Sequence, residues 1–364
     1  MKLYNPPNIK LPALKIEKTR QRKAIEDDPT VKNLLRSNLL LDFEFNTLYF
    51  DILKKSKELL NIISLNEDQL ALLAPEYTFH FPPSILRDHP IFKIAKFEIG
   101  INIIKFIMYY EKYKKGEDIF DIPEDKKKQL EDIFDIPEDK KRQLDEAILK
   151  LRKEIYPNFL KQIIEVSNNI QDSISDFEEK REIELSILSS TNVYVCQNCS
   201  KIISINKFKP CTCACGEKIT KISQQVNQIS IYHFNKLLID FVEQNYWLEY
   251  GVDYLLRRKN FQTLVGYNVL GHSGVWHEID NIADIKSENY RILCECKNTK
   301  VEVYDIFVFS GKMVDVGCTH GYVFTTSEKI SDDAARLARQ KNIEIVKGVL
   351  TRETEDLLED IKEG

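Results

Sequence analysis

Five of the chain's eight cysteines fall within a stretch of twenty residues, between Cys196 and Cys215. They form two groups, which read Cys196-Gln-Asn-Cys199 and Cys211-Thr-Cys213-Ala-Cys215. A short turn between two closely spaced cysteines points both side chains to the same side. Two turns of this kind, about 10–20 residues apart, can direct four thiolates at one ion, in the tetrahedral shell that structural zinc takes. The cluster therefore predicts a small zinc ribbon over residues 193–222, and it argues against a disulfide framework.

The second cysteine group offers three thiols for two ligand positions. We favour Cys213 and Cys215 as partners of Cys196 and Cys199, because the glycine at position 216 relaxes the turn after the last ligand. Cys211 is then a spare thiol, or it replaces one of the pair. Four protein ligands leave no open position on the ion, so we expect a structural zinc, with free or redox-active thiols as the alternative.

The ribbon and its flanks carry a local excess of positive charge. Residues 193–235 contain five lysines and one acid. A basic ribbon can grip the phosphates of a nucleic acid, or it can join two domains, and the sequence leaves both roles open.

The last third of the chain alternates strand and helix patterns. We expect a helix over about 230–259, strands at 262–270, 276–285 and 290–298, a helix at 301–316, a strand at 321–326, a helix at 331–341 and a strand at 343–349. This order predicts a mixed α/β domain over 230–350 and not a repeated βαβ winding.

Acidic side chains and a lysine gather on two neighbouring strands of this domain. Glu278, Asp280 and Asp284 stand at even offsets and therefore share one face of the first strand, and Glu295 and Lys297 share one face of the next. Carboxylate oxygens suit Mg²⁺ or Mn²⁺, and a lysine beside them can orient water or stabilise developing negative charge. The pattern favours metal-assisted hydrolysis of a phosphodiester.

The spacing of these residues resembles a known family. Asp280 followed by Glu295-x-Lys297 is similar to the D-(x)n-E-x-K signature of the PD-(D/E)XK nuclease superfamily. Three surrounding blocks resemble the Mrr-like restriction endonucleases within it: Trp247-Leu-Glu-Tyr-Gly-Val-Asp-Tyr-Leu-Leu with Gly266-Tyr-Asn-Val, Gly321-Tyr-Val-Phe-Thr-Thr-Ser327, and Ser331-Asp-Asp-Ala-Ala-Arg-Leu-Ala338 with Asn342-Ile-Glu-Ile-Val346. The resemblance covers about residues 240–350, roughly a third of the chain.

The resemblance implies roles for five residues. Asp280 and Glu295 would be ligands of Mg²⁺ or Mn²⁺, Lys297 the catalytic lysine, and Glu249 a glutamate that reaches the site from the preceding helix. Glu278 is an additional acid on the approach to Asp280. Mrr-like sequences often have a glutamine where Glu295 stands and a Gly/Asp-rich approach to the first aspartate, so the full ligand set departs from the family pattern.

The implied activity is that of a metal-dependent DNA endonuclease, in restriction of foreign DNA. Repair or recombination is a competing role. A non-catalytic zinc-ribbon module that binds DNA on a nuclease scaffold, and a nuclease acting on RNA, are further alternatives. Cleavage of both DNA strands would favour a dimer.

The remainder of the chain carries no recognisable chemistry. We expect a basic flexible tail over residues 1–30 and a helical region over 31–190, with a break or kink at Pro157 and a polar linker at 188–192. Residues 117–130 and 131–144 form a tandem repeat of fourteen residues that differs at one position. Residues 351–364 read as an acidic C-terminal tail.

The complete fold is therefore expected to be multidomain, with an α-helical N-terminal region, a small zinc ribbon and a C-terminal mixed α/β, restriction endonuclease-like domain.

The distribution of charge says more about partners than the total of −5. The excess of acid belongs to residues 26–192 and to 351–364, which should not contact DNA, and we expect 26–192 to bind a protein partner or another copy of this chain. DNA contact is expected through the basic N-terminus, the ribbon and the catalytic face. The sequence contains no run of about 18 apolar residues and no signal-peptide pattern, so we expect no membrane span and a cytoplasmic location.

Overall fold

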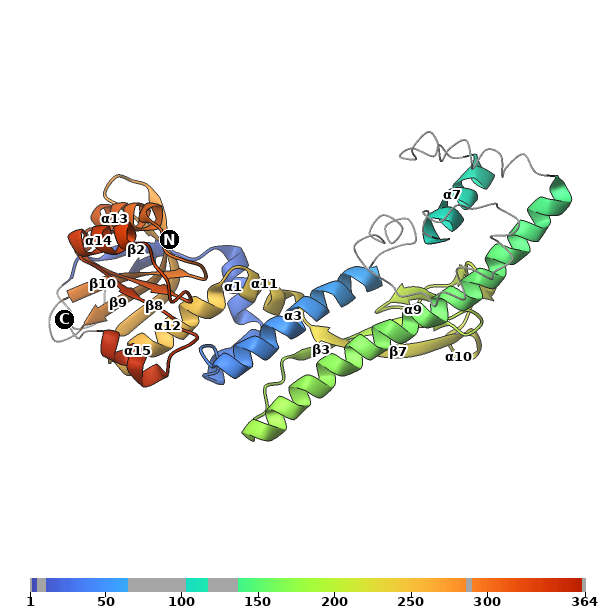
Figure 1. The fold of residues 1–364 in the computed structure, drawn as a ribbon, viewed down its shortest axis with the longest axis horizontal. Coiled ribbons are helices and arrows are strands. Elements are labelled where there is room, and N and C mark those ends of the chain that lie inside the picture. Colours follow the sequence, from blue (N-terminus) through green and yellow to red (C-terminus); the bar gives the residue numbers. More distant parts are fainter. Residues whose placement is uncertain (1, 5–10, 65–102, 117–136, 286–289, 362–364) are drawn as a thin grey trace. The chain divides into compact units, whose positions relative to one another are not determined.

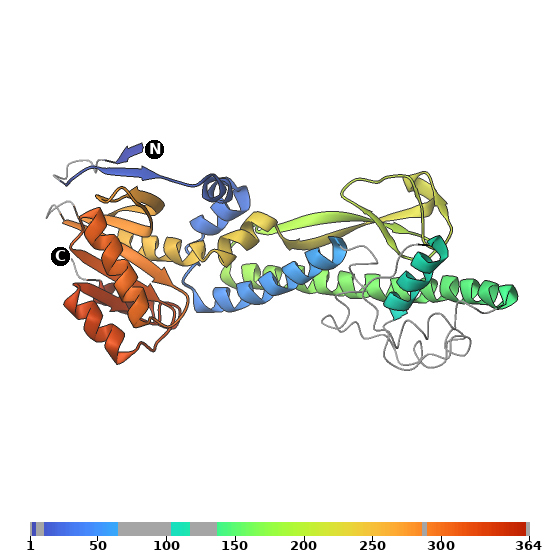
Figure 2. The same ribbon diagram turned by 90° about the horizontal axis from the view of Figure 1, so that it is seen from above.

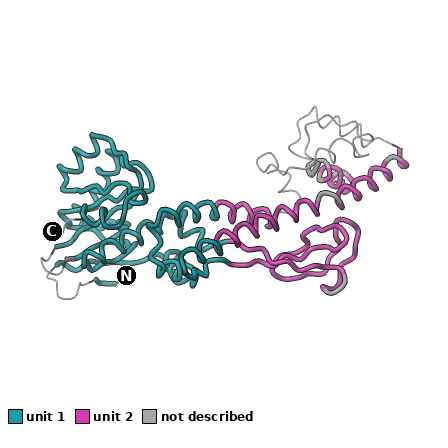
Figure 3. Tube along the Cα trace, turned by 60° about the horizontal axis from the view of Figure 1, so that its bottom comes forward, with its two compact units in different colours: residues 1–53, 175–188, 234–364 teal, residues 54–174, 189–233 magenta. Residues whose placement is uncertain are grey.

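The computed structural model describes residues 2–4, 11–64, 103–116, 137–285 and 290–361. The chain divides into two compact units (Figure 3). Unit 1 consists of residues 1–53, 175–188 and 234–364, and unit 2 consists of 54–174 and 189–233. Among the helices of the described residues, none has the length and apolar character that a membrane crossing requires.

A seven-stranded mixed sheet forms the centre of unit 1 (Figure 1). Its order is β1 (Lys2–Tyr4), β2 (Leu14–Glu17), β8 (Gln262–Leu270), β9 (Trp276–Ile285), β10 (Tyr290–Lys297), β11 (His320–Thr325) and β12 (Ile343–Val346). The strands from β1 to β10 pair antiparallel, and β10, β11 and β12 pair parallel.

Helices cover both faces of this sheet. Helices α13 (Val303–Val316) and α14 (Asp332–Gln340) lie on one face, and α12 (Tyr246–Arg258) and α15 (Thr354–Asp360) on the other (Figure 1). The parallel β10–β11 pair needs a crossover connection, which α13 supplies. The expected mixed α/β character of the C-terminal domain is confirmed.

The N-terminal residues are part of the sheet, so the prediction of a flexible tail over 1–30 is wrong. Leu14 and Ile16 are buried and alternate with polar residues, which is the pattern of a half-buried strand. Ile16 pairs with Val269, and the N-terminal strands lie at the edge of the sheet (Figure 2). Helix α1 (Arg20–Asp27) follows, and the Thr19 side chain caps it by accepting the Arg22 N–H.

The C-terminal residues are also folded, so the prediction of an acidic tail over 351–364 is wrong for the described part. Helix α15 buries Leu357, and Ile361 at its end is buried as well. The acids of this segment occupy the exposed side of an amphipathic helix. One of them, Glu355, pairs with Arg258 of α12 at 3.1 Å.

Helices make up most of the described residues between 29 and 181. They are α2 (Pro29–Arg36), α3 (Phe43–Ser64), α7 (Ile103–Lys115) and α9 (Glu138–Arg181). Helix α9 continues through Pro157, so the predicted break there is wrong, and the alternative of a kink stays a prediction. Residues 117–136, which hold the first repeat copy and the start of the second, lie outside the described residues.

Two further segment predictions are wrong. The expected linker at 188–192 is the start of strand β3 (Leu188–Cys196), and the start of the expected helix at 230–259 belongs to strand β7 (Val226–Phe234). The helical part is split into α11 (Lys236–Glu243) and α12, because Asn245 between them takes a left-handed conformation with a φ of 58°.

Unit 2 contains a three-stranded sheet and a small hairpin. The sheet has the order β4 (Ile202–Ile205), β3, β7, and the hairpin consists of β5 (Cys211–Thr212) and β6 (Lys218–Ile219). A short helix, α10 (Ile222–Gln225), precedes β7. The N–H of Tyr232 on β7 donates to the hydroxyl of Ser167 on α9, which connects the sheet to the long helix.

Candidate active site and four-cysteine centre

The candidate active site lies where β9 and β10 separate. Their antiparallel pairing runs from Tyr290 opposite Ile285 to Cys294 opposite Asn281. Asp280 and Glu295 come next on the two strands. Asp280 Oδ2 accepts the backbone N–H of Cys296 at 2.6 Å, so a side chain takes the place of the missing strand partner.

Glu295 is held between two lysines. Its Oε1 lies 3.1 Å from Lys297 Nζ, and its Oε2 lies 2.8 Å from Lys312 Nζ. The carboxylate is buried, with 8% of the residue exposed, so both ion pairs are partly shielded from water. Lys312 comes from α13 and also donates to the backbone carbonyl of Glu278 at 3.1 Å. This lysine therefore attaches α13 to both β9 and β10.

Lys297 is surrounded by negative charge. Besides Glu295 it has Asp305 Oδ1 at 3.5 Å. Partial burial lowers the pKa of Lys297, but the carboxylates of Glu295 and Asp305 outweigh burial and raise the pKa above its ordinary value. Lys297 is therefore a charged ammonium at neutral pH.

The carboxylates of the site crowd one another. Burial and the neighbouring Glu295 raise the pKa of Asp280 to about 7, although the Cys296 N–H and the Lys312 ammonium lower it. Burial and the charge of Asp280 also raise the pKa of Glu249, against the ion pair that Glu249 makes with Arg22. A cluster whose acids resist ionisation in this way is electrostatically suited to a cation.

Glu249 enters the site from the first turn of α12. Its Oε2 pairs with Arg22 Nη2 at 2.6 Å, and its backbone carbonyl accepts from the Asn281 side chain at 3.0 Å. Both Glu249 and Asn281 are buried. The Asn281 bond fixes α12 against β9, beside Asp280.

Two other acids of β9 have different surroundings. The Glu278 side chain is exposed, and its charge raises the pKa of Asp280. Asp284 is fully buried and pairs with Arg291 Nε at 2.7 Å, while the Tyr4 hydroxyl donates to it at 2.9 Å. Asp284 therefore ties β1, β9 and β10 together, four residues along β9 from Asp280.

The donor set fits a divalent cation. Asp280 Oδ1 and Glu249 Oε1 accept no hydrogen bond from the described residues, so each offers a hard oxygen ligand of the kind that Mg²⁺ takes. These acids do not form the tight cluster that the cysteines form: within the described part of the chain, only the four cysteines bring three or more ligand atoms within 4.8 Å of one another.

Sequence reasoning missed two residues of the site. Lys312 is the single charged residue in the run from Ile306 to Val314, and a lone charge in an apolar helix could have marked it as a candidate site residue. No feature of the sequence around Arg22 indicates that it contacts Glu249.

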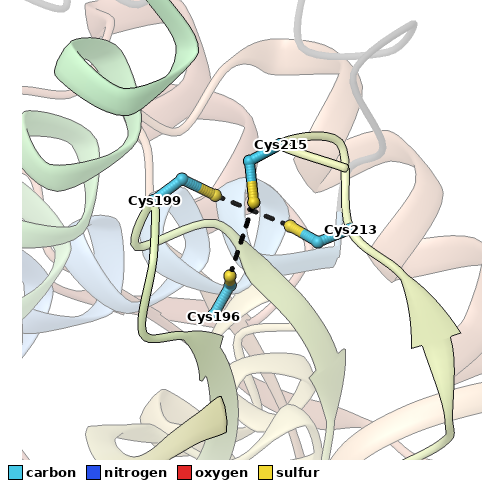
Figure 4. Close-up of side chains that lie close together, drawn as sticks. All are labelled: Cys196, Cys199, Cys213 and Cys215. Carbon is cyan, nitrogen blue, oxygen red and sulfur yellow. Dashed lines mark hydrogen bonds between the residues drawn. The ribbon is translucent and has the colours of Figure 1, made fainter. Parts of the chain in front are cut away.

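The second centre is formed by the four cysteines Cys196, Cys199, Cys213 and Cys215 (Figure 4). All four are buried. Cys196 Sγ lies 3.8 Å from Cys215 Sγ, and Cys199 Sγ lies 3.5 Å from Cys213 Sγ. Cys211 stands outside this set, half-buried on β5.

Backbone geometry aims the thiols inward. The N–H of Ser200 bonds back to the Cys196 carbonyl at 2.8 Å, and the N–H of Gly216 bonds back to the Cys213 carbonyl at 2.8 Å. Each donor follows the second cysteine of its turn, and each has a positive φ, 62° at Ser200 and 84° at Gly216. The Gly216 conformation is the one that glycine adopts without strain.

The thiol cluster has the electrostatics of a cation site. Sulfur hydrogen bonds, first of all from Cys199, lower the pKa of Cys213 to about 5 against the opposing effect of burial. The same contact with Cys213, together with burial, raises the pKa of Cys199. A four-cysteine cluster of this geometry can hold a metal ion.

Comparison with known proteins identifies the C-terminal domain. Residues 242–352 match the Mrr_cat family, described as restriction endonuclease. This part of the chain contains Glu249, Asp280, Glu295 and Lys297, and it resembles restriction endonuclease domains of the PD-(D/E)XK type.

Other comparisons add little. No curated protein matches the chain. Among solved structures, the chain is similar to protein VC1899 from Vibrio cholerae, with 17% identity and a TM-score of 0.29. The match covers 35% of this chain and 36% of that protein, so this chain spans about a third of its length.

Proposed function

We propose that the protein is a metal-dependent DNA endonuclease of the restriction type. The observation that carries the proposal is the meeting of Asp280, Glu295 and Lys297 at the point where β9 and β10 separate, inside the part of the chain that matches restriction endonucleases. Restriction of foreign DNA is the preferred role, and DNA repair or recombination is the competing one.

Asp280 and Glu295 are the proposed ligands of Mg²⁺ or Mn²⁺, with Glu249 as a third donor. The free oxygens of Asp280 and Glu249 and the crowding of the carboxylates support this assignment. A bound divalent ion supplies charge neutralisation at the phosphate and lowers the pKa of water. The residues themselves hold these oxygens in fixed positions, because Cys296, Asn281 and the lysines restrain them.

Lys297 is the proposed catalytic lysine. Its ammonium stays charged beside Glu295 and Asp305, so it can hold an attacking water or stabilise the negative charge that develops on the phosphate. Lys312 is a positioning residue in this scheme. It holds Oε2 of Glu295 while Lys297 holds Oε1, and so fixes the orientation of a carboxylate whose oxygens each keep a lone pair for a metal ion.

The four-cysteine centre is proposed to bind zinc in a structural role. Four thiolates complete a tetrahedral shell and leave no position for a substrate. Its buried surroundings, including Tyr194, Ile219 and Val226, make the ion part of a small core. Such thiols persist in a reducing compartment, and we therefore place the protein in the cytoplasm.

A cleavage assay on modified and unmodified plasmid tests the proposal. Purified protein is incubated with Mg²⁺, Mn²⁺ or EDTA, in parallel with single-stranded DNA and RNA. Nicking or cleavage of DNA that requires the divalent ion and disappears in Lys297→Ala is the expected result. Lys300→Ala is the matched control, because Lys300 lies only three residues after Lys297 and makes an exposed ion pair with Glu302.

Two results would contradict the proposal. Undiminished activity in both Asp280→Ala and Lys297→Ala would show that these residues are not the catalytic set. If the protein binds DNA but hydrolyses none, with every metal and substrate shape tested, it is a non-catalytic DNA-binding scaffold. If it degrades RNA and leaves DNA intact, it is an RNA nuclease.

A further inference from the structure

Arg22 of helix α1 reaches into the candidate active site from outside the family-matching residues. It is among the largest fully buried side chains of the described residues, with 2% exposed. Its Nη2 lies 2.6 Å from Glu249 Oε2, and its Nε lies 2.9 Å from Glu26 Oε1. The guanidinium also lies over the ring of Tyr246, 4.1 Å from the ring centre.

A glycine on β8 leaves room for the side chain of Arg22. Gly266 on β8 has a φ of +60°, and a Cβ at this position would lie 1.6 Å from Arg22 Cζ. Only a residue without a side chain allows the guanidinium to occupy that space. Pairing of Glu17 with Asn268 places the end of β2 beside this part of β8, two residues before the Thr19 cap of α1.

Stability alone does not explain a buried arginine here. Its Nη1 is buried and has no hydrogen-bond partner in the described part of the chain. A buried cation with an unsatisfied donor is less favourable than an apolar residue of similar volume would be. What the arginine provides is a charge-assisted bond to one particular oxygen of Glu249, which leaves Glu249 Oε1 without a hydrogen-bond donor among the described residues.

We propose that Arg22 is a positioning residue of the nuclease site, which holds the Glu249 carboxylate beside Asp280 so that its free oxygen faces the cation. Residues 14–27 and the family-matching residues 242–352 then form one catalytic unit. The inference rests on the proposed nuclease function, and it adds that the active site is incomplete without the N-terminal strand and helix.

The test compares full-length wild-type protein with Arg22→Gln by two measurements. Mn²⁺ affinity is measured by isothermal titration calorimetry, and DNA cleavage is measured as kcat and KM. Loss of a partner that orients a metal ligand lowers metal affinity or activity by roughly 10- to 100-fold. We expect a change of that size in Mn²⁺ affinity and in kcat, with an unchanged KM for DNA. Arg258→Gln is the control, because Arg258 makes an exposed pair with Glu355.

A double-mutant cycle separates positioning from a general structural role. If Arg22 acts through Glu249, Arg22→Gln has no further effect on Mn²⁺ affinity in a Glu249→Gln background. Additive losses would overturn the proposal, and so would wild-type Mn²⁺ affinity in folded Arg22→Gln. If Arg22→Gln does not fold, Arg22→Lys replaces it in the cycle, because it keeps the charge and loses the forked donor geometry.

The outcomes also separate this inference from the proposed function. Wild-type protein that binds Mn²⁺ but cleaves no nucleic acid would defeat the nuclease function, and the affinity cycle would still decide the role of Arg22. Wild-type protein that binds no Mn²⁺ would overturn both.

Discussion

Cys296 donates its backbone N–H to the carboxylate of Asp280 over 2.6 Å, at the point where strands β9 and β10 part. The bond fixes one oxygen of Asp280 and leaves the other without a hydrogen-bond donor among the described residues. An asparagine in place of Asp280 could still accept the Cys296 N–H through its side-chain oxygen, but it would carry no charge. This relationship therefore allows the proposed catalytic role of Asp280 to be tested without damage to the strands.

We expect Asp280→Asn to lose DNA cleavage by about 100-fold or more, at or beyond the upper end of the effects seen for groups around a metal. The fold should be retained. Thermal stability in EDTA should be equal to or higher than that of the wild type, because one of several mutually repelling carboxylates has been removed. Cleavage rates and thermal unfolding of the two proteins check this, and a large loss of stability would contradict it.

The two lysines on Glu295 should differ in importance. Lys297→Ala is expected to abolish cleavage, whereas Lys312→Ala should reduce it roughly 10- to 100-fold, because Lys312 only positions the carboxylate. Single-turnover rates at saturating Mg²⁺ measure both. If Lys312→Ala proved the more damaging variant, the assignment of the catalytic lysine would have to be exchanged.

The four-cysteine centre should bind a single zinc ion in the wild type and in Cys211→Ser. Cys213→Ser should lose the ion, because Cys213 is one of the four buried thiols and Cys211 is not. Zinc content after dialysis, measured by atomic absorption, distinguishes the variants. Zinc loss from Cys211→Ser with retention in Cys213→Ser would reverse the ligand assignment.

The edge strand β2 should contribute to the stability of unit 1. Ile16→Ala is expected to lower the free energy of unfolding by about 2–5 kcal/mol, the usual range for truncation of a fully buried isoleucine. Lys15→Ala, at an exposed position of the same strand, should change it little. Urea denaturation of both variants provides the measurement, and equal effects would show that the strand is not packed on the core.

Asp315 should make stability depend on acid pH. Hydrogen bonds from Ser273, followed by the one from His277, lower the pKa of Asp315 to about 2, below the value of about 3.9 for an unfolded aspartate. A lowered folded-state pKa means that its stabilisation is present above about pH 4 and is lost as the pH falls toward 2. The difference in urea midpoint between wild type and Asp315→Asn should therefore narrow as the pH falls from 4 toward 2. A difference that widens on acidification would contradict the assignment.

The strands of the catalytic domain were predictable because their signals are local. The observed bounds of β8 and β9 match the predicted ranges, since both strands combine β-branched and aromatic residues with turn residues at each end. The acids and Lys297 could be selected as candidates for the same reason, because alternation along a strand decides which side chains share a face.

The remaining features depend on contacts that are distant in sequence. Prolines near the N-terminus concealed the alternation of Leu14 and Ile16, whose burial depends on a strand some 250 residues later. The helix expected at 230–259 failed because Asn245 ends one helix and starts another through a left-handed residue. Arg22 meets Glu249 across 227 positions, and no local pattern records such a pairing.

That separation has a consequence for synthesis of the protein. The ribosome produces Arg22 early and delivers Glu249, Asp280 and Glu295 only after unit 2 has emerged, because residues 54–174 and 189–233 lie between them in the chain. Pairings between such distant segments close late in folding. The nascent chain is therefore expected to lack the assembled candidate site until both ends of unit 1 have met.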